Sequence, residues 1–284
     1  MGIKIRAGYE ISYECPQPTP MIVTLNVHQT RRHDLLTPDR MLLEPFVAAK
    51  DYIDGFGNIC HVIRAPAGRL TMSADFLIED SGAPDDVAPE ALQHTLETLP
   101  VETLVYLLGS RYCETDRLSE FAWAKFGKVP KGWTLVQTIV DFVHEHVSFG
   151  YEHANATKTA FDTYNERRGV CRDFAHLAVT LCRCLNIPAR YCTGYLGDIG
   201  VPRDPAPMDF SAWFEVYLGD RWYTFDARHN TPRVGRILIA RGRDATDVAI
   251  ATSYGLCTLA GFKVVTDEAL EPEALRSPAA VATS

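Results

Sequence analysis

Several features that assign a chain to particular classes of protein are missing from these 284 residues. No apolar run approaches the roughly 20 residues of a membrane-spanning helix, so we expect no membrane insertion. Lys and Arg number 28 against 36 Asp and Glu, for a formal net charge of -8. Since no basic face is available to neutralise phosphates, we expect no nucleic-acid partner. The chain also has no internal repeat and no long low-complexity tract.

Metal and redox motifs are missing as well. None of the eight cysteines forms a Cys-x-x-Cys pair, and no Asp-x-Asp-x-Asp-Gly calcium loop occurs. Cys182 and Cys184, like His144 and His146, are two residues apart in helical patterns, so each pair points to different sides of its helix. A metal-binding or redox protein is therefore a weak hypothesis, and the sequence predicts no metal and no cofactor.

The start of the chain gives an expectation about the compartment. Its polar and apolar residues alternate, without the basic-then-apolar layout of a secretory signal. Arg6 stands where an N-myristoylation pattern needs Ser or Thr. These features predict a cytoplasmic protein in which the eight cysteines are reduced.

A hydrophobic fraction of 46% and a charged fraction of 23% are typical of a globular chain of one large or two smaller domains. Alternating apolar residues and Pro- or Gly-bearing turns predict an antiparallel β domain over residues 1–85. An acidic linker leads to helical patterns at 102–126 and 133–149, within a second unit that spans 86–268. Residues 269–284 are predicted to be a flexible tail.

The most informative stretch is a predicted helix that opens near Val170 and ends before Ile187-Pro188. Cys171 falls in its first turn, where unpaired amide donors and the helix dipole favour a thiolate. We therefore expect the thiol pKa of Cys171 to be lowered and the sulfur to be nucleophilic. The seven other cysteines lack this setting and are expected to pack in the core: Cys15, Cys60, Cys113, Cys182, Cys184, Cys192 and Cys257.

A second informative segment, 209–230, predicts a β-hairpin that turns at Gly219-Asp220. The register pairs Tyr217 with Trp222 and Glu215 with Thr224. Ser211 and Asp226 then lie on one face of the sheet as diagonal neighbours, a geometry that suits a base held by a carboxylate.

Together, GVCRDFAHLAVTLCRCLNIPARYCTGYL (169–196) and AWFEVYL followed by WYTFDAR (212–228) resemble the core of the transglutaminase-like superfamily of Cys-His-Asp enzymes. The resemblance implies an α+β fold, in which an N-terminal antiparallel β domain precedes a papain-like core with the nucleophile opening a helix packed on an antiparallel sheet. It further implies that Cys171 is the nucleophile and that Asp226 orients the base. Members form or cleave amide bonds through an acyl-enzyme.

The chain departs from the family pattern at the base. The family's histidine opens the strand before Ala212, and here that position is Ser211, which cannot exchange a proton near neutral pH as imidazole does. His229 follows Asp226 by three residues, and a turn at Asn230 and Pro232 is one way to bring its ring to Cys171. The sequence leaves His229 open as relocated base or surface histidine.

Two other histidines are weaker alternatives for the base. His153 precedes the helix of Cys171 in a loop. His176 lies five residues into that helix, about 140° around its axis, so it faces away from Cys171 and is interpreted first as a structural histidine satisfied in the helix packing. Trp213 and Trp222 are interpreted either as walls of a cleft or as core aromatics. Arg172 and Arg190 are interpreted either as carboxylate-binding or as structural residues.

Two functional hypotheses are open. The first is a cysteine-dependent acyl-transfer enzyme, a protease or amidase, that acts on peptide or other amide substrates with Cys171, Asp226 and His229 as catalytic residues. Hydrolysis is favoured over cross-linking by analogy with the family. The second is a binding or scaffold protein that keeps the fold without the base, and Ser211 is the feature that favours it. The sequence does not identify the acyl acceptor or the oligomeric state.

Overall fold

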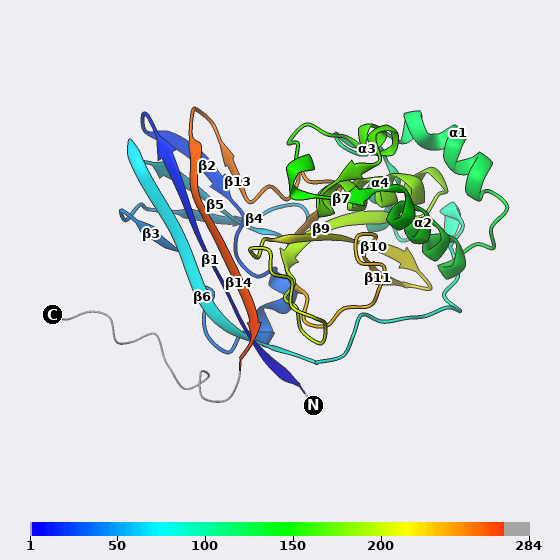
Figure 1. The fold of residues 1–284 in the computed structure, drawn as a ribbon, viewed down its shortest axis with the longest axis horizontal. Helices are drawn as coiled ribbons and strands as arrows, with labels where there is room; N and C mark the ends of the chain where they lie inside the picture. Colours follow the sequence, from blue (N-terminus) through cyan, green and yellow to red (C-terminus); the bar gives the residue numbers. More distant parts are fainter. Residues whose placement is uncertain (1, 270–284) are drawn as a thin grey trace.

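Alternating strands at the start of the chain form two antiparallel sheets with a shared core (Figure 1). In the computed structural model, which describes residues 2–269, every second residue of the long strands is buried, for example Leu70, Met72 and Phe76. This alternation places one face of each sheet on the core. The strands are β1 (Ile3–Cys15), β2 (Thr19–Val23), β3 (Leu42–Glu44), β4 (Lys50–Ile53), β5 (Ile59–Ala65) and β6 (Gly68–Asp80).

The last two strands of the chain complete these N-terminal sheets. β13 (Ala251–Ser253) pairs with β2, and β14 (Thr258–Glu268) pairs with β1, giving the orders β14-β1-β6-β3 and β13-β2-β5-β4. The domain boundaries predicted from the sequence assign residues 251–268 to the second domain, 86–268. β13 and β14 pair with β2 and β1, strands that lie more than 200 residues earlier, and no local sequence pattern reveals such long-range pairing. The expected tail falls almost entirely on residues 270–284, which lie outside the described residues.

The middle of the chain forms the α+β part at the right of Figure 1, as the predicted fold class requires. A four-stranded antiparallel sheet of order β11-β10-β9-β12 is covered by helices, and β7 pairs with β8. The hairpin register is confirmed, with Tyr217 opposite Trp222 and Glu215 opposite Thr224. The elements are α1 (Thr115–Phe126), α2 (Trp133–His146), β7 (Ser148–Phe149), α3 (Ala160–Glu166), β8 (Arg168–Gly169), α4 (Cys171–Cys184), β9 (Ala189–Tyr195), β10 (Ser211–Leu218), β11 (Arg221–Phe225) and β12 (Ile237–Gly242).

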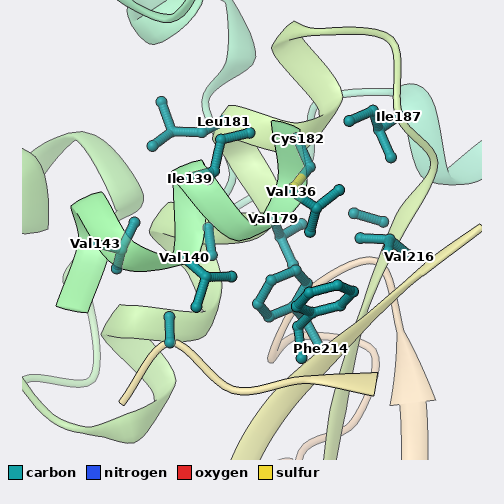
Figure 2. Packing of buried hydrophobic residues seen from close by; sticks show 14 of the residues in the cluster. Val136, Ile139, Val140, Val143, Val179, Leu181, Cys182, Ile187, Phe214 and Val216 are labelled. Carbon is teal, nitrogen blue, oxygen red and sulfur yellow. The ribbon is translucent and has the colours of Figure 1, made fainter. Parts of the chain in front are cut away.

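Helix α4 is the centre of this part. It is buried from Asp173 to Cys184, and its Val179 packs with Val140 of α2 and Phe214 of β10 in one cluster (Figure 2). The helices expected at 133–149 and from Val170 onward are confirmed. Among residues 2–269, none of the helices is both long and apolar enough to cross a membrane.

The prediction of a helix over 102–126 is wrong for the first half of that range. Residues Val101–Leu107 form a 3-10 helix, and the α-helix begins only at Thr115. The buried guanidinium of Arg183 donates to the carbonyl of Leu108 at 3.0 Å and to the hydroxyl of Ser110 at 3.2 Å. In a continuous helix the carbonyl of Leu108 would accept a hydrogen bond from within the helix, but here Arg183 of α4 binds it. This tertiary contact overrides the helical preference of the local sequence.

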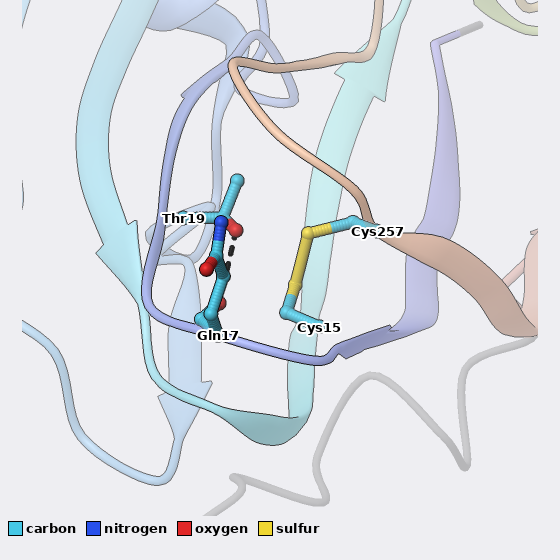
Figure 3. Close-up of a disulfide and its surroundings, with 4 residues drawn as sticks. All are labelled: Cys15, Gln17, Thr19 and Cys257. Atoms are coloured by element: carbon cyan, nitrogen blue, oxygen red, sulfur yellow. Dashed lines mark hydrogen bonds between the residues drawn. A yellow bond between two sulfur atoms is a disulfide. The ribbon is translucent and has the colours of Figure 1, made fainter.

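A disulfide links β1 and β14, which are neighbouring strands of one sheet although they are far apart in the sequence. Cys15, the last residue of β1, is bonded to Cys257, just before β14, across a sequence separation of 242 (Figure 3). The expectation that these two cysteines are reduced is therefore wrong, whereas Cys15 is buried in the core as expected and Cys257 packs against the same cluster. The two sulfurs meet because β1 and β14 are neighbours, which the sequence spacing does not reveal. Whether the protein is cytoplasmic stays a prediction.

Replacing both bridge cysteines by serine is expected to lower the free energy of unfolding by about 2–4 kcal/mol, because the bridge restricts the unfolded chain. Denaturant unfolding of C15S/C257S against wild type measures this. As a control, the unreduced, denatured wild type should expose six thiols and the reduced protein eight, since six cysteines are free in the structure. Eight thiols without reductant would contradict the bridge.

Candidate active site

Cys171 is the first residue of α4, as the sequence predicts. The helix starts there because Asp173, at the third helical position, accepts a hydrogen bond from the backbone N–H of Val170 at 2.9 Å. Gly169 is needed just before it, since a Cβ at that position would come within 2.5 Å of Oδ2 of Asp173. As the first helical residue, Cys171 has a backbone N–H with no partner in the helix.

Cys171 opens into a small cavity of about 60 Å³. Ser211, from the start of β10, and Arg228 and His229, from the turn after β11, line the same cavity. Much of the remaining wall comes from the loop 196–210, including Asp209. The structure thus brings two of the three proposed catalytic residues, together with Ser211, around one space.

The third residue, Asp226, lies immediately behind His229. The Nδ1 atom of His229 is 2.8 Å from Oδ2 of Asp226, and the backbone N–H groups of Arg228 and His229 both donate to Oδ1 at 3.0 Å. Arg236 donates to Oδ2 of Asp226 at 3.0 Å and is also paired with Asp85. These contacts fix the imidazole in one orientation and leave Nε2 as its other functional atom.

The electrostatic balance at Asp226 results from the same contacts. Burial by itself would raise the pKa of Asp226, but the charge of Arg236 and the hydrogen bonds from His229 outweigh it and hold the pKa well below its usual range. Asp226 is therefore an ionised carboxylate at neutral pH, buried and with all its partners supplied by the chain.

The thiol of Cys171 does not have the lowered pKa expected from its position. Burial raises the pKa of Cys171 to about 11, and the nearby carboxylates of Asp209 and Asp226 act in the same direction. The charge of Arg228 and the backbone N–H of Ala212 oppose this rise without cancelling it. Desolvation therefore exceeds the effect of the helix start, and the resting sulfur is a neutral thiol that needs a base.

Alkylation of native Cys171 by iodoacetamide is accordingly expected to accelerate about tenfold per pH unit from pH 7 to pH 10, because the thiolate fraction grows in that proportion below the pKa. Quantitative mass spectrometry of the Cys171 peptide measures the rate. Cys182, which is fully buried in the same helix, is the internal control. A rate that levels off below pH 8 would instead indicate a preformed thiolate.

The alternative histidines serve other contacts. His176 is stacked on Tyr112 and accepts a hydrogen bond from the backbone of Ala245 through Nε2, and burial lowers its pKa to about 3. His153 is 3.5 Å from the carboxylate of Glu152 and does not line the cavity of Cys171. His144 and His146 are bound to backbone carbonyls at separate places. The interpretation of His176 as a structural residue is confirmed.

Trp213 and Trp222 line a different cavity and do not form walls around Cys171. Sequence reasoning also missed three charged residues of the site. Arg236 is distant from the recognised motifs, and its role depends on a buried contact that spacing does not indicate. Arg228 stands inside the quoted WYTFDAR segment, and Asp209 is two residues before Ser211, so proximity to the motif was the only available signal.

The geometry agrees with comparisons to known proteins. Residues 123–227 match the model of the transglutaminase-like superfamily. A solved structure titled a "putative cysteine protease" from Cytophaga hutchinsonii is 30% identical, superposes with a TM-score of 0.79, and the alignment covers 94% of this chain and 91% of that one. The chain therefore belongs to the transglutaminase-like superfamily.

Two mycobacterial relatives extend the comparison. An uncharacterized protein of Mycobacterium leprae is 26% identical over 237 residues, covering 72% of this chain and 75% of the relative. An uncharacterized protein of Mycobacterium tuberculosis is 27% identical over 237 residues, with coverage of 74% and 73%. The similarity thus extends well beyond the residues of the family model.

Proposed function

We propose that the protein is a cysteine-dependent acyl-transfer enzyme that acts on peptide or carboxamide bonds through a thioester on Cys171. The observation that carries the proposal is that His229 shares the cavity of Cys171 while its Nδ1 lies 2.8 Å from the buried carboxylate of Asp226. An imidazole oriented in this way can replace the histidine that the family has at the position of Ser211.

The proposed first step begins with the neutral thiol. Nε2 of His229 accepts the thiol proton as the sulfur of Cys171 bonds to the amide carbon, and the Nδ1 proton remains on its hydrogen bond to Asp226. The free backbone N–H of Cys171 is a donor for the developing oxyanion. His229 then gives the proton to the departing nitrogen, the carbon–nitrogen bond breaks, and an acyl thioester and an amine or ammonia result.

The second step releases the acyl group. Water or a primary amine gives a proton to Nε2 of His229 and attacks the thioester carbon. The carbon–sulfur bond then breaks, and the sulfur recovers the proton. We propose hydrolysis as the main outcome, in line with the protease and amidase activities that the family resemblance implies. The ionised state of Asp226 supports an imidazolium in both steps.

The test uses hydroxylamine as the acyl acceptor, because it converts thioesters of any substrate into hydroxamates. Wild type and Cys171→Ala are incubated with a set of glutamine-, asparagine- and C-terminally amidated peptides, and hydroxamates and Cys171-bound acyl groups are measured by mass spectrometry. We expect both products with wild type and neither with Cys171→Ala. If wild type forms neither product from any peptide, the enzyme hypothesis fails and the scaffold hypothesis, favoured by Ser211, replaces it.

A further inference from the structure

A second cavity, of about 300 Å³, lies on the face of the β9–β12 sheet that α4 does not cover. Arg241 of β12 is opposite Cys192 of β9, and Cys192 is opposite Trp213 of β10, so these side chains share one face. Phe214, the next residue of β10, packs in the cluster of α4 on the other face. A volume near 300 Å³ is at the lower end of the range of small-molecule sites.

Five arginines and four carboxylates line this cavity, and most of the arginines have a carboxylate partner. Arg31 is 3.3 Å from Asp80, Arg236 is 2.9 Å from Asp85, and Arg221 is paired with Asp86. Two indole rings, those of Trp213 and Trp222, complete the lining from the sheet.

Arg241 is the exception. Within residues 2–269, no carboxylate lies at ion-pair distance from its guanidinium. Glu215, the carboxylate whose charge acts on Arg241, is already bound by Arg190 at 2.5 Å. Burial lowers the pKa of Arg241, and the charge of Arg190 adds to this, so the uncompensated positive charge is unfavourable at this position.

Two neighbouring arginines also retain unused donors. The side chains of Arg233 and Arg236 are 6% and 7% exposed, yet Nε of Arg233 and Nη1 of Arg236 have no hydrogen-bond partner. Both residues line the cavity. Buried donors without partners are rare in folded proteins, so both guanidinium groups keep hydrogen-bonding capacity beside the cavity.

We propose that this cavity binds a small oxyanion, a carboxylate or phosphoryl group, through the guanidinium of Arg241. Arginine presents a planar fork of donors that matches both groups in a bidentate manner. Trp222, which is partly exposed and carries the guanidinium of Arg190 on its ring, contributes aromatic surface for the remainder of the ligand. The proposal concerns binding only and does not depend on the proposed acyl-transfer activity.

Isothermal titration of the full chain with inorganic phosphate and with citrate, in chloride buffers of matched ionic strength, tests the proposal. We expect saturable binding of at least one anion, and the preferred one identifies the class of ligand. Arg241→Gln should weaken that binding by about tenfold or more, because a charge-assisted hydrogen bond of roughly 1.5–3 kcal/mol is lost. Arg241→Lys, which keeps the charge without the fork, should give an intermediate loss.

The matched control is Arg221→Gln, because Arg221 lines the same cavity but is 55% exposed and already paired with Asp86. It should bind the anion about as tightly as wild type. Thermal melting and circular dichroism establish that each variant is folded. The absence of saturable binding in wild type, or equal losses in Arg241→Gln and Arg221→Gln, would overturn the proposal.

Discussion

Replacing His229 by glutamine is expected to lower kcat/KM for an amide substrate by about 10²–10⁴-fold, the range that general acid–base catalysis supplies. Glutamine keeps the size and polarity of the side chain but cannot accept the thiol proton of Cys171. Because burial raises the pKa of Cys171 to about 11, few thiolates form without a base. Steady-state hydrolysis of the best peptide found with wild type measures the loss.

Ser211→Ala is the matched comparison, since Ser211 lines the same cavity. We expect its kcat/KM to stay close to that of wild type, because a serine hydroxyl does not accept a proton near neutral pH. The double variant Ser211→His/His229→Gln returns an imidazole to the family position and is expected to recover part of the activity. A large loss in Ser211→Ala with full activity in His229→Gln would contradict the assignment of His229 as base.

The parts of the site that the sequence could predict depend on local structure. Cys171 at the start of a helix and Asp226 after a hairpin strand are both indicated by periodicities and turns over fewer than about 20 residues. The position of His229 depends on the turn after β11. Asn230 adopts a positive φ of 51°, and its N–H donates to the carbonyl of Asp226 at 2.8 Å. This turn ends the strand alternation and allows the ring of His229 to contact Asp226.

The parts that the sequence could not predict depend on burial and on contacts between distant segments. The pKa of Cys171 is set by desolvation, which outweighs the helix start and is not visible in residue spacing. Arg236 reaches Asp226 and Asp85 from the segment before β12. The Cys15–Cys257 bridge requires that the first and last strands be neighbours.

Asp226→Asn is expected to lower kcat by about 10²–10⁴-fold while leaving Cys171 and His229 in place. An asparagine side chain can present its amide group to Nδ1 of His229, which favours the tautomer with the proton on Nε2 and so removes the acceptor for the thiol. The loss should appear in kcat more than in KM, because Asp226 lies behind His229 and is not part of the cavity lining. Steady-state kinetics of the two substitutions, Asp226→Asn and His229→Gln, should therefore give similar losses.

The same substitution should also change stability, because it leaves Arg236 buried with only one of its two carboxylate partners. Breaking a buried pair in this way costs about 3–5 kcal/mol. The pKa of Asp226 is lower in the folded than in the unfolded chain. Its stabilisation is therefore fully present above its ordinary pKa of about 3.9 and is lost as the pH falls through the folded value. Asp226→Asn should thus narrow the difference in unfolding free energy between pH 7 and pH 3.

Asp85→Asn separates the two effects of Asp226. It removes the other partner of Arg236, whose Nε lies 2.9 Å from Asp85, without touching His229. We expect it to destabilise the fold while retaining most of kcat, since the hydrogen bond between His229 and Asp226 remains. If Asp85→Asn instead lost as much kcat as Asp226→Asn, the ion pairs of Arg236 would be the contacts that organise the site. The direct contact of Asp226 with His229 would then be secondary.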